Sequence, residues 1–101
     1  MKIVLCCGSG MSSGFMAQNI KKAAKKRGIQ AEVIARSESL IENFLNNTDI
    51  VLIAPHLASE SEHIAKRCGD IPVLVIDRTN YGMLDGESIL NEILKCLEKR
   101  S

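Results

Sequence analysis

The chain has 101 residues, of which 46% are hydrophobic and 25% charged, and this balance is typical of one globular domain over residues 1–101. Thirteen basic and twelve acidic residues leave a net charge of +1, and only three residues are aromatic, so nucleic-acid binding is not expected. No apolar run approaches the roughly 20 residues of a membrane helix, and polar turn residues come too early for a secretory signal, which predicts a cytoplasmic protein.

The first half of the chain alternates between apolar runs and amphipathic segments. Residues 2–6 (KIVLC) form a short continuous apolar run, and a stripe of Met16, Ile20, Ala23 and Ala24 follows opposite several lysines, with Gly28 as a stop. Residues 31–35 (AEVIA) are rich in β-branched side chains. Leu40, Ile41, Phe44 and Leu45 then repeat the helical spacing, which predicts strand, helix, strand and helix in that order.

The second half continues this alternation. Residues 49–54 (DIVLIA) and 71–77 (IPVLVID) have the composition of strands buried on both faces, and a weaker helical stripe runs from Leu57 to Cys68 between them. The clearest stripe lies in the last predicted helix, from about Gly86 to Lys99. These elements predict an α/β fold, an open four-stranded parallel sheet with helices on both faces, built from right-handed βαβ units.

Ligands of such sheets bind at the carboxyl ends of the strands, which directs attention to the loops after the first, third and fourth strands. The first of these loops lies between a buried strand and an amphipathic helix, so its amides can face an anion at the helix N-terminus. Its glycines can form a concave nest of amides, and its serines add hydroxyl donors. The predicted phosphate-binding residues are Gly8, Ser9, Gly10, Met11, Ser12 and Ser13.

Cys7 opens this loop, where free amides and the positive end of a helix dipole favour the thiolate form of a cysteine. A thiolate there can act as a nucleophile towards phosphorus, and the same amides would stabilise the phosphoryl oxygens in the transition state. Alternatively, Cys7 merely ends the strand and the glycines form an ordinary turn. Cys6 points to the opposite face and is expected to be structural, as are Cys68 and Cys96. The four cysteines lack zinc-ligand spacing, and neither a metal nor another cofactor is expected.

Three segments resemble one known family in the same order along the chain. The string C-G-S-G-M-S from Cys7 resembles the signature that opens IIB proteins of the lactose/cellobiose phosphotransferase family. DIVLIAPH (49–56) is similar to the family's third strand, and VIDRTNYGMLDG (75–86) is similar to its V-I-D…Y-G-x-x-D-G segment. The resemblance implies that Cys7 accepts phosphate from a histidine of the IIA protein and passes it to a sugar, such as cellobiose, bound by the membrane IIC component.

The resemblance also marks the border of the expected site. Pro55 and His56 stand where family members have a Gly-Pro-Gln-like turn, so an imidazole is expected near the Cys7 loop, either with a role there or as a solvated residue. Tyr81 and Asp85 match the late loop, although a tight turn before the last helix accounts equally for its glycines. A monomer is expected, because no exposed apolar patch is evident. The resemblance implies that it associates with the membrane through IIC.

A hydrolase similar to the low-molecular-weight tyrosine phosphatases, whose fold the predicted sheet resembles, is the main alternative. Its motif C-x5-R needs an arginine where this chain has Ser13, or Ser12 when counted from Cys6, so the guanidinium clamp on phosphate is absent. A redox role for the adjacent cysteines would require a strained vicinal disulfide. The cations from Lys21 to Arg27 either face an acidic partner or form a solvated face.

Overall fold

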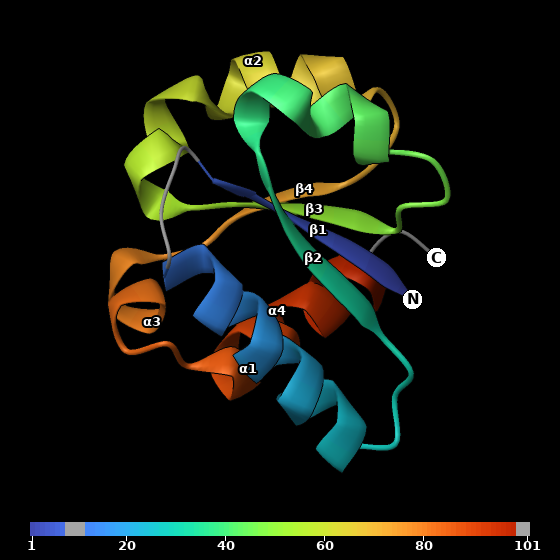
Figure 1. Ribbon diagram of the computed structural model, residues 1–101, viewed down its shortest axis with the longest axis vertical. Coiled ribbons are helices and arrows are strands. Elements are labelled where there is room, and N and C mark those ends of the chain that lie inside the picture. The colour runs from blue at the N-terminus through green and yellow to red at the C-terminus, as the bar shows by residue number, and fades with distance from the viewer. Residues whose placement is uncertain (8–11, 99–101) are drawn as a thin grey trace.

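The computed structural model describes residues 1–7 and 12–98, which form a single sheet with helical segments on both faces (Figure 1). The strands are β1 (Lys2–Cys7), β2 (Glu32–Ser37), β3 (Ile50–Ile53) and β4 (Val73–Val75). The helices are α1 (Ser12–Lys26), α2 (Ser61–Cys68), α3 (Arg78–Gly82) and α4 (Gly86–Glu98), and two 3-10 segments are η1 (Glu38–Phe44) and η2 (Pro55–Glu60).

All neighbouring strands are parallel, and their order is β2-β1-β3-β4, which confirms the predicted four-stranded sheet. The two central strands, β1 and β3, are buried on both faces from Ile3 to Cys7 and from Ile50 to Ile53. Their sequences are therefore continuous apolar runs. The edge strand β2 is only half-buried, and it accordingly carries Glu32 and Arg36 among its apolar residues.

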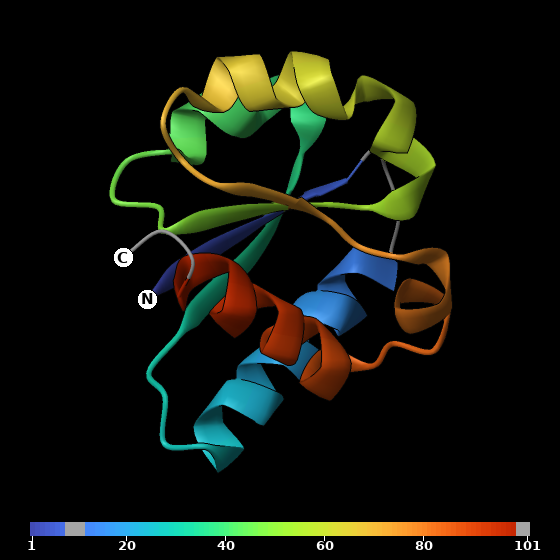
Figure 2. The same cartoon turned by 180° about the vertical axis from the view of Figure 1, so that it is seen from behind.

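Each face of the sheet has its own hydrophobic core, because successive residues of a strand point to opposite faces. Helices α1 and α4 cover one face, and η1, η2 and α2 cover the other, as both views show (Figures 1 and 2). On the first face Ile3 and Leu5 pack with Met16 and Ile20 of α1 and Ile89 and Ile93 of α4. On the second face Val4, Cys6 and Ile53 pack with Ile41, Ile64 and Cys68.

Helix α1 ends where the sequence predicted a stop. Gly28 has a φ angle of 73°, in the left-handed region that glycine adopts without strain, and its N–H donates to the Lys25 carbonyl at 3.1 Å. The next residue, Ile29, donates to the Ala24 carbonyl at 2.9 Å. These bonds satisfy the last carbonyls of the helix and turn the chain towards β2.

Two expectations about helices need correction. The segment around Leu40 is the 3-10 helix η1, not an α-helix, and Leu40 itself is 51% exposed while Ile41 is buried. With three residues per turn, Leu40 and Ile41 cannot both face the sheet. The loop after β4 contains the short helix α3, which was not predicted, because a five-residue helix carries too few turns for a periodic pattern. No helix in the described part of the chain has both the length and the apolarity to cross a bilayer.

Candidate functional site

One row across the sheet, at the carboxyl ends of its strands, consists of Ser37, Cys7, Ala54 and Ile76, and we call it the Cys7 row. Ser37 of β2 is the register partner of Cys7 of β1. The ladder continues on the other side, where Ala54 donates to the Cys6 carbonyl at 3.1 Å and Ile76 donates to the Ile53 carbonyl at 2.9 Å. Cys7 therefore sits in a central position of the edge at which ligands of parallel sheets bind.

Cys7 is the last residue of β1, and it is 7% exposed. Strand alternation directs its side chain to the face that α1 and α4 cover, as for Ile3 and Leu5. Its Sγ lies 3.5 Å from the carbonyl oxygen of Arg36, to which the thiol can donate. Helix α1 begins at Ser12, so the positive end of its dipole lies at the same edge of the sheet.

The loop predicted to bind phosphate is only partly within the structure. Ser12 and Ser13 are the first two residues of α1, as expected for residues at a helix N-terminus. Gly8, Ser9, Gly10 and Met11 lie outside the described residues. Their predicted contribution to the site therefore rests on the sequence pattern.

Cys6 differs from Cys7 in its surroundings, although the two are adjacent in the chain. It is fully buried in the core between the sheet and α2. Burial raises the pKa of the Cys6 thiol to about 12, and the neighbouring Cys7 adds to this effect. Cys6 therefore lies in the core on the opposite face from Cys7, as strand alternation predicted. Cys68 is buried in the same core, and burial raises its pKa as well.

His56 and Tyr81 come together beside the carboxyl ends of β3 and β4. Their rings are T-shaped, with centroids 6.1 Å apart and an interplanar angle of 69°. Tyr81, in α3, packs against the core under α1 and α4, while His56, in η2, is exposed. Pro55 occupies the first position of η2, where a missing N–H carries no penalty. The structure therefore unites three of the predicted border residues on one side of the Cys7 row.

Asp85 has a different setting from these border residues. Its Oδ1 accepts from the Ser88 N–H at 3.1 Å and its Oδ2 from the Ser88 hydroxyl at 2.8 Å, so the carboxylate caps α4. These hydrogen bonds lower the pKa of Asp85. Asp85 also lines a shallow hollow with Asn19, Lys22 and Lys26, which lie beyond the first turn of α1. Its carboxylate is therefore engaged in capping α4.

Two residues at the edge were missed by the sequence analysis. Arg36 accepts the Cys7 thiol on its carbonyl, but its guanidinium donates to the Ala35 carbonyl at 2.7 Å and lies 4.8 Å from the Phe44 ring centroid. That contact directs the guanidinium to the face that η1 covers. Ser37, beside Cys7, has its hydroxyl 3.0 Å from that of Ser39. Both residues directly follow the predicted strand 31–35 and form the last two residues of β2, which extends further than the sequence predicted.

The described residues contain no group of three or more His, Cys, Asp and Glu side chains that could hold a metal ion. Among the described residues, Cys7 has beside it the Arg36 carbonyl, its register partner Ser37 and, at the same edge of the sheet, the N-terminus of α1. A helix N-terminus stabilises an anion through its free amides and its dipole.

The chain is similar to known proteins along most of its length. Residues 2–92 match the family model described as "PTS system, Lactose/Cellobiose specific IIB subunit". The chain is 33% identical over 95 residues to the galactose-specific EIIB component of Lactococcus lactis subsp. cremoris, covering 87% of this chain and 88% of that protein. A solution structure of the cellobiose-specific phosphotransferase IIB component from Borrelia burgdorferi has a TM-score of 0.77 and 34% identity, with 100% of this chain and 94% of that chain covered. A shorter match, 30% identical over 64 residues, is to the lactose-specific EIICB component of Lacticaseibacillus casei, covering 63% of this chain and 11% of that protein.

Proposed function

This chain belongs to the lactose/cellobiose-specific IIB family of the phosphotransferase system, and from this membership we propose that Cys7 carries a phosphoryl group between two partner proteins. IIB components are phosphotransferases that work with IIA and IIC partners. The observation that supports the proposal most is the position of Cys7 at the carboxyl end of a central strand, at the edge where α1 begins.

In the first transfer, the Cys7 thiolate attacks the phosphorus of a phosphohistidine on IIA. A sulfur–phosphorus bond forms while the nitrogen–phosphorus bond breaks, and the leaving imidazole nitrogen takes up a proton. Three phosphoryl oxygens carry the charge in the transition state. The amides and hydroxyls of residues 8–13 and the dipole of α1 stabilise that charge, in place of an arginine.

In the second transfer, a hydroxyl oxygen of a sugar held by IIC attacks the phosphorus of phosphocysteine. An oxygen–phosphorus bond forms, the sulfur–phosphorus bond breaks, and sulfur leaves as a thiolate while the hydroxyl proton passes to a base. The sugar is a β-glucoside or a disaccharide of the cellobiose type, in line with the description of the family and with the name of the Borrelia burgdorferi relative. The chain acts as a monomer in the cytoplasm and meets IIC at the membrane.

The burial of Cys7 supports a carrier more than a freely reactive thiol. A residue that is 7% exposed offers its sulfur to a partner that docks closely while limiting access of bulk solvent. The rings of His56 and Tyr81 and the segment at Pro55 border the site on the β3 and β4 side. The guanidinium of Arg36, which is held against Phe44, does not supply the clamp that a phosphatase would need.

The test is incubation with phosphorylated IIA, followed by intact mass measurement and peptide mapping. We expect one phosphoryl group on Cys7, none on a Cys7→Ser variant under conditions that preserve thiophosphate esters, and wild-type uptake by Cys6→Ala. Phosphate on any other residue would contradict the assignment. The phosphatase alternative predicts sustained turnover of aryl phosphates that disappears in Cys7→Ser, whereas the carrier should turn them over negligibly.

A further inference from the structure

Helix α1 presents a set of lysines on the side opposite its buried stripe. Lys21, Lys22 and Lys25 are exposed, and together with Gln18 they line a shallow hollow of about 220 Å³ on the outer surface of the helix. We call these three lysines the lysine face. None of their ammonium groups is ion-paired within the described part of the chain, whereas Arg27, on the same segment, pairs with Glu87 at 3.0 Å.

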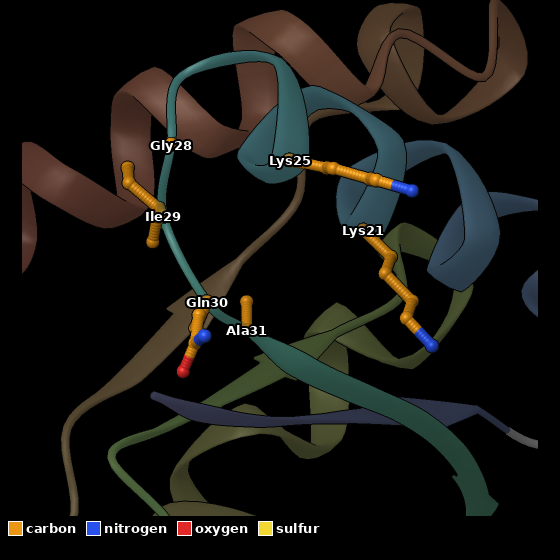
Figure 3. A pocket seen from close by; sticks show the side chains of 6 residues that line it. All are labelled: Lys21, Lys25, Gly28, Ile29, Gln30 and Ala31. Atoms are coloured by element: carbon orange, nitrogen blue, oxygen red, sulfur yellow. The ribbon is translucent and has the colours of Figure 1, made fainter.

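A second, larger hollow of about 480 Å³ adjoins the lysine face (Figure 3). Lys21 and Lys25 form one wall of it, and the segment from Gly28 to Ala31 forms the other. Ile29 and Ala31 contribute apolar surface, and Gln30 contributes an amide. No carboxylate of the described residues lines either hollow. The larger hollow therefore combines two unpaired lysines with apolar surface from Ile29 and Ala31, which suits the phosphate and glycerol region of an amphiphilic anion.

Lys26 is not part of this face, although it is adjacent in sequence. It lines a different hollow with Lys22, Asp85 and Glu87, on the side of α1 that meets α4. Those carboxylates offset the charge of Lys26 and part of the charge of Lys22. Lys21 and Lys25 are the two members of the lysine face whose hollows are lined by no carboxylate of the described residues. The uncompensated charge of α1 is therefore that of Lys21 and Lys25, in a chain whose overall net charge is only +1.

We propose that the lysine face binds the headgroups of anionic phospholipids, so that the protein lies against the inner surface of the membrane. Clusters of basic residues on an amphipathic helix attract anionic lipid, and lysine stems can lie along apolar surface while their charges reach the headgroups. Lys21 and Lys25 are four residues, or about one helical turn, apart on α1. This spacing matches a surface that carries many charges better than a single small anion.

The position of the lysine face leaves the Cys7 edge accessible. Helix α1 starts at Ser12 at the carboxyl edge of the sheet, and Lys21 and Lys25 lie about 14–20 Å further along its axis. Lipid bound at this end of the helix keeps the protein beside a membrane partner without covering Cys7. This binding goes beyond the phosphoryl transfer proposed above and does not depend on it.

The test is co-sedimentation of the protein with vesicles that contain phosphatidylglycerol in phosphatidylcholine, compared with vesicles of phosphatidylcholine alone. We expect binding only to the anionic vesicles and a decrease as salt is added. A Lys21→Gln/Lys25→Gln variant should bind about thirtyfold more weakly, from roughly 1 kcal/mol for each lysine. The matched control, Lys66→Gln/Lys95→Gln, removes two exposed lysines from the last turns of α2 and α4 and should bind as the wild type does.

Several results would overturn the proposal. These are absence of binding to anionic vesicles at low salt, equal weakening in both double variants, or equal binding to neutral vesicles. Binding of inorganic phosphate or of an acidic protein by the lysine face, without binding to vesicles, would assign the face to another ligand and overturn it as well. A Cys7→Ser protein should still bind vesicles, which separates this result from any failure of the carrier function.

Discussion

Gly86 of α4 lies directly against the backbone of Asn19 in α1. A Cβ atom on Gly86 would stand 2.5 Å from both the carbonyl carbon and the carbonyl oxygen of Asn19, and 2.8 Å from the nitrogen of Ile20. Gly86 is therefore required for the close crossing of these two helices. Its φ angle is not positive, so the close contact with Asn19, and not a left-handed backbone, is what requires glycine here.

We expect Gly86→Ala to destabilise the protein by about 1–3 kcal/mol, because the contact is with backbone atoms that cannot rotate away. Urea unfolding followed by circular dichroism measures this change. The matched control is Gly14→Ala in α1, where an added Cβ meets nothing within 4 Å and should stabilise by about 0.4–1 kcal/mol. If Gly86→Ala has the same unfolding free energy as the wild type, α1 and α4 can move apart at no cost and the prediction is wrong.

The Cys6 thiol should make stability fall at alkaline pH. Its pKa is about 12 in the folded protein, above the ordinary value of 9.0, so the folded state retains the proton while the unfolded state loses it. The Cys6 contribution is complete below pH 9 and declines as pH rises towards 12, by at most about 1.4 kcal/mol per pH unit. The difference in unfolding free energy between the wild type and Cys6→Ala should therefore shrink as pH is raised from 8, because only the wild type has the Cys6 contribution to lose. A constant difference between them would contradict the neutral, buried thiol.

Asp85 should contribute to stability as the cap of α4 and little to phosphoryl transfer. Asp85→Ala should lower the urea midpoint, whereas Asp85→Asn keeps an oxygen acceptor for Ser88 and should lose less. Because its pKa is lowered in the folded state, the advantage of Asp85 over Asn is present at neutral pH and disappears as pH falls below the ordinary value of 3.8. Phosphate uptake from IIA by Asp85→Asn should match the wild type. Loss of uptake in a folded variant would give Asp85 a direct role.

The ring contact between His56 and Tyr81 should order the β3 and β4 side of the site. Tyr81→Phe keeps the ring and should accept phosphate from IIA at nearly the wild-type rate, whereas Tyr81→Ala removes the contact and should slow acceptance several-fold. A double-mutant cycle of stability with His56→Ala should give a coupling of about 0.5–1.5 kcal/mol. A rate loss in Tyr81→Phe equal to that in Tyr81→Ala would instead indicate that the hydroxyl acts on the phosphoryl group.

The amino-acid sequence by itself determined the class of fold, its family and the position of Cys7. Continuous apolar runs identified strands that are buried on both faces, as β1 and β3 are, and the stripe from Met16 to Ala24 identified α1 with its stop at Gly28. These patterns are local, because each depends on residues within a few turns or on strand alternation. The motif from Cys7 to Ser12 was readable for the same reason.

Only the tertiary structure decided which distant residues meet. The strand order brings Ser37 beside Cys7, and the turns after β3 and β4 bring His56 to Tyr81. In the structure Asp85 caps α4, and Gly86 contacts the backbone of Asn19. The sequence alone showed only a late loop with two glycines. Contacts of this kind depend on how α1 and α4 pack on the sheet, and helix packing is set by the shapes of both surfaces together, which no local pattern records.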